Sequence, residues 1–252
     1  MMAAKNKGIE AEDNSQIDST KGIQIKLDKK TNNGIVYSLY WYLGMWNAKF
    51  FKLIGVGPNA ISIASLLVYI LAGWCFYTSG YTMNIGGGVI VFFGILLDCT
   101  DGKLARMTNK SSYLGIWFDC NIDYVRYLFL YPPIALAILR DTNDTNALVY
   151  AFVIIVTILC STIIFMRWDL FPFAKSFKSD LTKKSKIHIV AKQFYAIAEI
   201  EPFVIIFFAL MDRMLEFLLI WSVWNTFYFM GSSIMYGIKA HKEDIKARQK
   251  KE

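Results

Sequence analysis

Histidine and cysteine are scarce in this chain of 252 residues, which holds two histidines and four cysteines. The histidines, His188 and His241, stand in lysine-containing polar stretches, and no two cysteines form a C-x-x-C pair. The chain therefore has almost no material for a hydrolytic triad, a histidine-rich metal site or a zinc site. The cysteines fall in apolar stretches, where we expect small buried residues rather than disulfides: Cys75, Cys99, Cys120 and Cys160.

Charged residues are also sparse, at 19% of the chain, whereas 55% of the residues are hydrophobic and the mean hydropathy is +0.37. This composition is typical of a polytopic membrane protein rather than a soluble domain. The net charge of +7 does not indicate nucleic-acid binding. No module that combines aromatic and basic residues is visible, and membrane proteins collect Lys and Arg in their cytoplasmic segments.

A spanning helix needs about 20 mostly apolar residues. Six stretches approach this length, although the fifth is short: about 60–78, 85–106, 113–139, 147–168, 202–211 and 215–238. The sequence therefore predicts an all-α polytopic membrane protein with six transmembrane helices.

An aromatic-rich segment, 34–56, precedes the first of these stretches and ends just before Pro58. Because a new span begins there at once, we expect an interfacial amphipathic helix rather than another span. The predicted membrane domain then covers residues 34–240. Residues 1–33 are polar and lack aromatics, so we expect a disordered tail, and 241–252 form a charged tail.

The loop charges predict an orientation for this arrangement. With six spans, all but three of the 27 Lys and Arg residues fall on one side, the exceptions being Arg126, Arg140 and Arg213. Basic residues accumulate on the cytoplasmic side of membrane proteins. Both termini, and the turn between the second and third spans, are therefore expected to be cytoplasmic.

Four carboxylates stand in apolar sequence beside that turn. Asp98 and Asp101 lie at the end of the second span, and Asp119 and Asp123 lie in the first half of the third. Each pair has a spacing that places its members on one helix face. Because only a short turn separates the two helices, they should be antiparallel neighbours whose acidic faces meet in one cavity.

Four carboxylates in one cavity repel each other, and each costs several kcal/mol in a membrane unless it is paired or bound to a cation. An oxygen-only ligand set favours Mg²⁺, with Mn²⁺ as the alternative, and two such ions would balance four carboxylates. Paired metal ions of this kind support phosphoryl displacement. Gly102, Ala105 and Gly115 leave room for a bulky ligand, and Arg106 supplies a positive charge for phosphate oxygens.

The spacing D-x2-D-G-x2-A-R-x8-G-x3-D-x3-D, from Asp98 to Asp123, resembles the signature of the CDP-alcohol phosphotransferase (CDP-alcohol phosphatidyltransferase) family. The run 58–62, PNAIS, also looks like the family's usual start of the first span. The resemblance implies an integral membrane enzyme, usually a homodimer, that opens to the cytoplasm. Such enzymes transfer a phosphate-bearing alcohol from a CDP conjugate to an acceptor hydroxyl and release CMP.

The resemblance also implies roles for individual residues. Asp98, Asp101, Asp119 and Asp123 would hold the metal ions, and Asp123 would also be the general base for the acceptor hydroxyl. The nucleotide and its phosphates would be contacted by Asn59, Ser62, Gly102, Arg106 and Ser112.

The preferred function is the Mg²⁺-dependent transfer of a phosphatidyl group from CDP-diacylglycerol to a small alcohol, in phospholipid biosynthesis. One alternative reverses the roles: a CDP-aminoalcohol or CDP-polyol donor would react with a lipid hydroxyl. An alternative of another class is a cation or proton transporter that uses the buried carboxylates. The transporter would need no cytidine and would release no CMP.

Two further features concern the acceptor. Tyr124 follows Asp123 where many family members carry Arg, and Arg126 lies three residues after the aspartate. We expect Arg126 to pair with Asp123 or a neighbouring carboxylate, the alternative being a phosphate anchor for the acceptor. Glu199 and Glu201 are interpreted as acids at a helix start, which suit the helix dipole. The alternative is that they mark an acceptor pocket that does not select anions.

Overall fold

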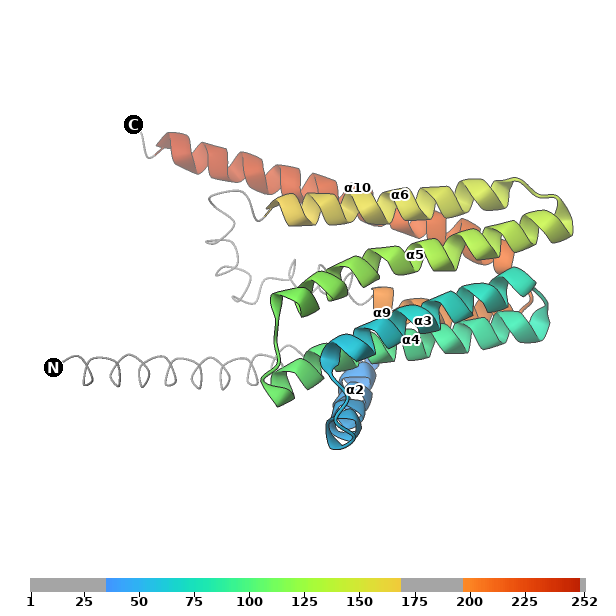
Figure 1. Ribbon diagram of the computed structural model, residues 1–252. Helices are drawn as coiled ribbons and strands as arrows, with labels where there is room; N and C mark the ends of the chain where they lie inside the picture. The colour runs from blue at the N-terminus through green and yellow to red at the C-terminus, as the bar shows by residue number, and fades with distance from the viewer. Residues whose placement is uncertain (1–34, 169–196, 250–252) are drawn as a thin grey trace.

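The computed structural model describes residues 35–168 and 197–249, and this part of the chain is helical without a strand. The predicted 1–33 tail lies outside the described residues. The helices, labelled as in Figure 1, are α2 (Ile35–Leu53), α3 (Pro58–Thr78), α4 (Tyr81–Thr108), α5 (Tyr113–Thr142), α6 (Asn146–Trp168), α9 (Ile197–Leu210) and α10 (Met214–Gln249).

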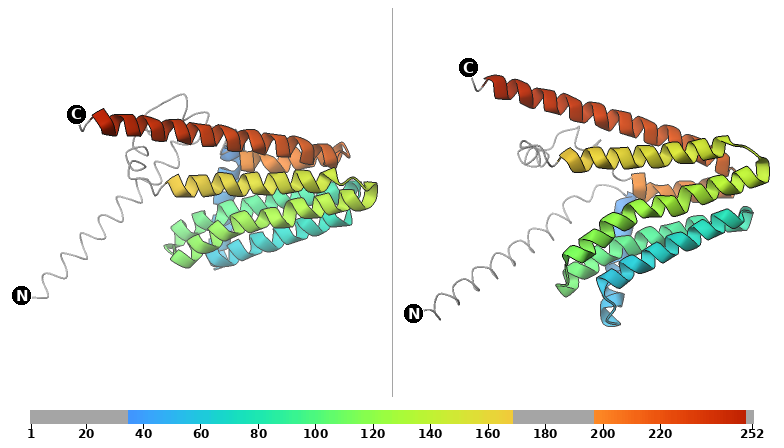
Figure 2. Two further views of the ribbon diagram at one scale, coloured as in Figure 1. Left: turned by 90° about the horizontal axis from the view of Figure 1, so that it is seen from above. Right: turned by 45° about the horizontal axis from the view of Figure 1, so that its top comes forward.

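Helices α3, α4, α5, α6 and α10 run alongside one another, while α2 crosses one end of this bundle (Figures 1 and 2). Helix α3 packs against α4 and α5, α6 lies between α5 and α10, and α9 packs against α4. The α4–α5 turn, the start of α3 and α2 all lie at the same end (Figure 1). This architecture agrees with the predicted all-α fold.

Four of the helices in the described residues, α3 to α6, are long and apolar enough to cross a membrane. They match the first four predicted spans to within a few residues. The fifth and sixth correspond to α9, which has 14 residues, and to α10, which has 36; neither meets the same measure of length and hydropathy. Six spans therefore stay a prediction, and α10 continues well past the predicted end of the last one.

Local sequence sets the helix boundaries around the α4–α5 turn. Pro58 occupies the first position of α3, where its fixed φ suits a helix start. Asn109 ends α4 in the left-handed conformation at φ 55°, which Asn tolerates better than most residues. Ser112 then caps α5, because its Oγ accepts a hydrogen bond from the Gly115 amide at 3.0 Å.

Helix α2 carries apolar residues both on the face that packs against the bundle and on the face that points away from it. Tyr40 and Ala48 are buried against the bundle, whereas Trp46 on the other side is 76% exposed. Lys52 near its end donates to the Met107 carbonyl of α4 at 3.4 Å. The interfacial position of this helix stays a prediction.

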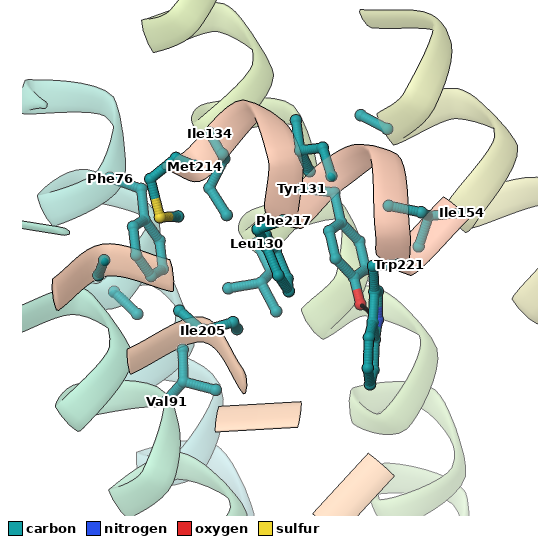
Figure 3. Packing of buried hydrophobic residues seen from close by; sticks show 14 of the residues in the cluster. Phe76, Val91, Leu130, Tyr131, Ile134, Ile154, Ile205, Met214, Phe217 and Trp221 are labelled. Carbon is teal, nitrogen blue, oxygen red and sulfur yellow. Dashed lines mark hydrogen bonds between the residues drawn. The ribbon is translucent and has the colours of Figure 1, made fainter. Parts of the chain in front are cut away.

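The largest hydrophobic core lies between α3, α4, α5, α6, α9 and α10, and α2 adds Tyr40 to it. Figure 3 shows its central side chains, with Leu130 and Tyr131 of α5 facing Phe217 and Trp221 of α10. Ile205 of α9 fills the space toward α4. This core fixes the helices whose ends carry the polar site.

One close helix contact gives a testable prediction for stability. A Cβ at Gly73 of α3 would lie 2.2 Å from the Phe129 carbonyl oxygen of α5. Backbone cannot move away cheaply, so Gly73→Ala should lower the free energy of unfolding by about 1–3 kcal/mol. Gly86→Ala is the matched control, because a Cβ there meets nothing within 4 Å. Thermal unfolding in detergent should show a lower Tm for Gly73→Ala alone, and equal Tm values would contradict the close contact.

Candidate metal and nucleotide site

The candidate site lies where the end of α4, the start of α5 and the start of α3 come together. Helix α4 carries Asp98 and Asp101 in its last three turns, and α5 carries Asp119 and Asp123 in its first three. The short α4–α5 turn brings the two acidic segments to one end of the bundle. The expectation that α4 and α5 are packed neighbours is wrong, because in the described part of the chain both helices pack against α3 instead of against each other. The predicted meeting of these faces is what the structure shows for three of the four aspartates.

Asp98, Asp101 and Asp119 form the aspartate group: each offers a carboxylate oxygen, and these oxygens all lie within 4.8 Å of one another. Asp101 is 5% exposed, Asp98 is half-buried and Asp119 is exposed. The group therefore runs from the protein interior to its surface, so that a ligand could approach from the Asp119 side.

Asp123 lies outside the aspartate group. Its Oδ1 is 3.6 Å from Nη1 of Arg126, and its side chain is 43% exposed while that of Arg126 is 8% exposed. The expected pairing of Arg126 with Asp123 is thus present. Asp123 lies one helical turn from Asp119. Its role as a metal ligand stays a prediction.

The start of α3 touches the aspartate group through Ser62. This serine is 3% exposed, and its Oγ donates a hydrogen bond to Oδ2 of Asp101. Asn59, one turn earlier, lies against α5: its Oδ1 would be 3.1 Å from a Cβ at Gly115. Three helix ends therefore meet around the aspartate group.

The two motif glycines have different surroundings. Among the described residues, a Cβ at Gly102 would meet only Arg106 Nη1, at 3.8 Å, so that this part of the structure leaves open space beside Asp101. A Cβ at Gly115 would crowd Asn59 and the Ser112 Oγ, which would be 3.3 Å away. Gly102 thus leaves room for a ligand, whereas Gly115 allows close packing of α3 on α5.

Ser112 has a structural task in this arrangement, because it caps α5. Arg106 is exposed at the end of α4, near the open space at Gly102. Nucleotide contacts by either residue, and by Asn59, Ser62 and Gly102, stay predictions. All five lie at the same end of the bundle as the aspartate group.

The chemistry of the aspartate group fits a hard divalent cation. Its ligand atoms are carboxylate oxygens alone, which suit Mg²⁺ and Mn²⁺ better than zinc. A hydrogen bond from Ser62 orients Asp101, as outer partners of metal-binding carboxylates commonly do. Asp98, Asp101 and Asp119 are therefore the residues that would hold a metal ion.

The sequence did not predict a cluster of buried polar side chains that begins beside Asp123. This polar cluster consists of Arg126, Tyr69, Tyr127, Tyr131 and Glu201. Arg126 donates to the hydroxyls of Tyr69 and Tyr127, at 3.3 and 2.9 Å. Glu201 is 2% exposed rather than a solvent-facing acid at a helix start. A signal was present in part, because Asp119, Asp123, Tyr127 and Tyr131 repeat every four residues and thus share one face of α5.

The fold and the site together define an integral membrane protein of packed helices with an oxygen-ligand site at one end. The sequence model of the CDP-alcohol phosphatidyltransferase family matches residues 56–229. Because this match covers more than half of the chain, the protein belongs to that family. The resemblance inferred from the motif is confirmed, and membership places the chain among transferases of phosphate-containing groups.

A curated relative is an archaetidylinositol phosphate synthase from Pyrococcus horikoshii. It is 39% identical to this chain over 70 residues, which are 28% of this chain and 36% of the relative. The chain thus spans about a third of that relative's length in the match.

Proposed function

We propose that this protein transfers a phosphatidyl group from a CDP-linked lipid, CDP-diacylglycerol or its ether counterpart, to a small alcohol and releases CMP, in phospholipid biosynthesis. The observation that carries the proposal is the meeting of Asp98, Asp101 and Asp119 beside the start of α3. Family membership supports the transferase class.

In the proposed reaction the acceptor oxygen attacks the phosphorus that carries the lipid. A new bond forms between these two atoms, and the bond from that phosphorus to the CMP oxygen breaks. The acceptor proton passes to a carboxylate oxygen of Asp123, and CMP leaves. Divalent ions held by the aspartate group would neutralise the diphosphate and make CMP a better leaving group.

The residues present suit the two requirements of this reaction, metal binding and removal of the acceptor proton. The Ser62 hydrogen bond holds Asp101 at the buried side of the group. Asp123 is partly exposed, and its 3.6 Å separation from Arg126 is longer than a tight ion pair. Asp123 is therefore restrained but keeps oxygen atoms free for a proton, as a general base requires.

We further propose that the nucleotide lies beside the open space at Gly102. Its phosphates would face Arg106, and its remaining contacts would come from Asn59, Ser62 and Ser112. Positions at three converging helix ends support this placement. The distribution of basic residues supports a cytoplasmic site and cytoplasmic termini. A homodimer stays a prediction.

CMP release tests the proposal directly. Purified protein in nanodiscs would receive Mg²⁺, CDP-diacylglycerol or CDP-archaeol, and a panel of serine, inositol, inositol phosphate and glycerol phosphate. The archaeal relative is named for archaetidylinositol phosphate, which is why an ether lipid and inositol phosphate belong in the panel. Acceptor-dependent CMP release supports the proposal. Release only from CDP-choline or CDP-ethanolamine with diacylglycerol supports reversed roles, and ion flux without CMP release contradicts transfer.

The Ser62 hydrogen bond gives a prediction for this assay. Ser62→Ala removes a buried donor to the Asp101 carboxylate, and such a bond to a charged group contributes about 1.5–3 kcal/mol. Turnover should therefore fall by roughly 10- to 100-fold. Ser65→Ala is the control, because in the described part of the chain the Ser65 hydroxyl bonds only to the Ser62 carbonyl, at 2.7 Å. Equal losses in both variants would contradict a specific role for Ser62.

A further inference from the structure

Two buried charges within the helices have no part in the reaction as described so far. Among the described residues, the buried charged side chains are Asp101, Arg126 and Glu201. Asp101 belongs to the aspartate group, whereas Arg126 on α5 and Glu201 on α9 are 6% and 2% exposed. An ionisable group inside a membrane protein is costly and usually serves a function with a specific partner.

Glu201 bonds to a tyrosine of α5 that is itself held by a side chain of α10. The Tyr131 hydroxyl of α5 donates to Oε1 of Glu201, and Nε1 of Trp221 on α10 donates to the same hydroxyl at 2.8 Å. Figure 3 shows the Tyr131 hydroxyl pointing toward Trp221 within the core. The Tyr131 hydroxyl is thus used as both donor and acceptor, and it fixes the Glu201 carboxylate at the junction of α5, α9 and α10.

Aromatic contacts continue from Tyr131 to the guanidinium group. The rings of Tyr127 and Tyr131 are stacked, with centroids 5.9 Å apart and an interplanar angle of 11°. Arg126 donates to the Tyr127 hydroxyl at 2.9 Å, and its Cζ is 4.8 Å from the Tyr127 ring centroid. The polar cluster therefore connects Glu201 to Arg126 through two tyrosines.

Arg126 stands at the end of the polar cluster that is nearest to the site, and its Nη1 lies 3.6 Å from Oδ1 of Asp123. The guanidinium is not saturated: within the described part of the chain, its buried Nε has no hydrogen-bond partner. A buried cation attracts any anion near it strongly, because the surroundings screen charge poorly. The fewer other anions act on Arg126, the more strongly it would hold Asp123 in a close pair, away from the acceptor.

We propose that Glu201 is a positioning residue that balances the charge of Arg126 and thereby keeps Asp123 available to the acceptor. This inference rests on the proposed function. In this arrangement Tyr69 and Tyr127 hold the guanidinium in place, and Glu201 compensates its charge. Asp123 is then oriented by Arg126 without forming a tight ion pair with it.

A double-mutant cycle tests the inference. Glu201→Gln keeps an oxygen that can accept from Tyr131 and removes the charge. We expect kcat to fall about tenfold, within the range of coupling between neighbouring charged residues, while KM for the CDP donor stays within about twofold. In the Arg126→Gln background, where no cation can capture Asp123, Glu201→Gln should change kcat by less than about twofold.

The matched control is Glu216→Gln, which removes the charge from an exposed pair with Arg213 at 3.1 Å and should leave kcat unchanged. Equal losses from Glu201→Gln in both backgrounds, or no loss in either, would overturn the inference. Such a result with an active wild type would leave the proposed function intact. A wild type that releases no CMP from any donor would overturn both.

Tyr131→Phe provides an independent test if Glu201→Gln does not fold, because it keeps the charge and removes the hydroxyl that holds it. We expect a several-fold loss of kcat with an unchanged KM for the donor, and this loss should vanish in the Arg126→Gln background. An unchanged kcat for Tyr131→Phe, or a loss that persists without Arg126, would overturn the inference.

Discussion

Asp101→Asn is expected to reduce CMP release by about a thousandfold or more, since charge stabilisation by a bound metal ion contributes several kcal/mol. Asp101 is the buried member of the aspartate group, and Asn keeps its shape and can still accept from Ser62. The substitution therefore removes one negative charge with little change in packing. Initial rates of CMP release over a range of Mg²⁺ concentrations would measure the loss.

Asp212→Asn is the matched control for this prediction. Asp212 has a φ of 56°, which Asn tolerates, and it lines a cavity of about 700 Å³ with Ser79, Tyr81 and Arg140. Those residues mark the opposite ends of α3, α4 and α5 from the aspartate group. Full activity in Asp212→Asn with near-complete loss in Asp101→Asn supports the site. Comparable activity in the two variants would contradict it.

Asp123→Asn is expected to lower turnover by about 10²–10⁴-fold, the usual contribution of a positioned general base. Because Asp123 lies outside the aspartate group, binding of the CDP donor should change little. The amide cannot accept the acceptor proton, so the loss should appear in kcat. Single-turnover kinetics with pre-bound donor would separate the chemical step from binding.

Asn121→Ala serves as a control on the same helix, because the Asn121 side chain is exposed and, within residues 35–168 and 197–249, bonds only to the Trp117 carbonyl, at 2.6 Å. Its turnover should match that of the wild type. Turnover close to that of the wild type in Asp123→Asn would remove this residue as base. A loss of donor binding as severe as in Asp101→Asn would instead assign Asp123 to metal binding.

The sequence was sufficient to place the aspartate group because its determinants are local. Helical spacing put Asp98 beside Asp101, and the short turn between α4 and α5 brought both acidic segments to one end of the bundle. The packing of α3 against both helices, in place of direct α4–α5 packing, was not predictable from this local pattern. Pro58 and Ser112 marked helix starts by well-understood chemistry. The contact of Ser62 with Asp101 was expected only from the family resemblance.

The polar cluster could not be predicted in the same way because it is tertiary. Glu201 stands near the start of α9, where an acid is ordinary, and only the packing of α9 against the bundle buries it. Trp221 and Tyr131 are 90 residues apart in the chain. Hydropathy likewise left the last helix ill-defined, because α10 continues to Gln249 beyond its apolar part.

The proposed site requires a divalent ion held by carboxylates from α4 and α5, and a measurement of Mn²⁺ binding tests this requirement most directly. Electron paramagnetic resonance of purified protein in nanodiscs, titrated with Mn²⁺ in the presence of the CDP donor, would count bound ions. The account predicts saturable binding in the wild type and in Asp212→Asn, and its loss in Asp101→Asn. Equal Mn²⁺ binding by the wild type and Asp101→Asn would contradict it.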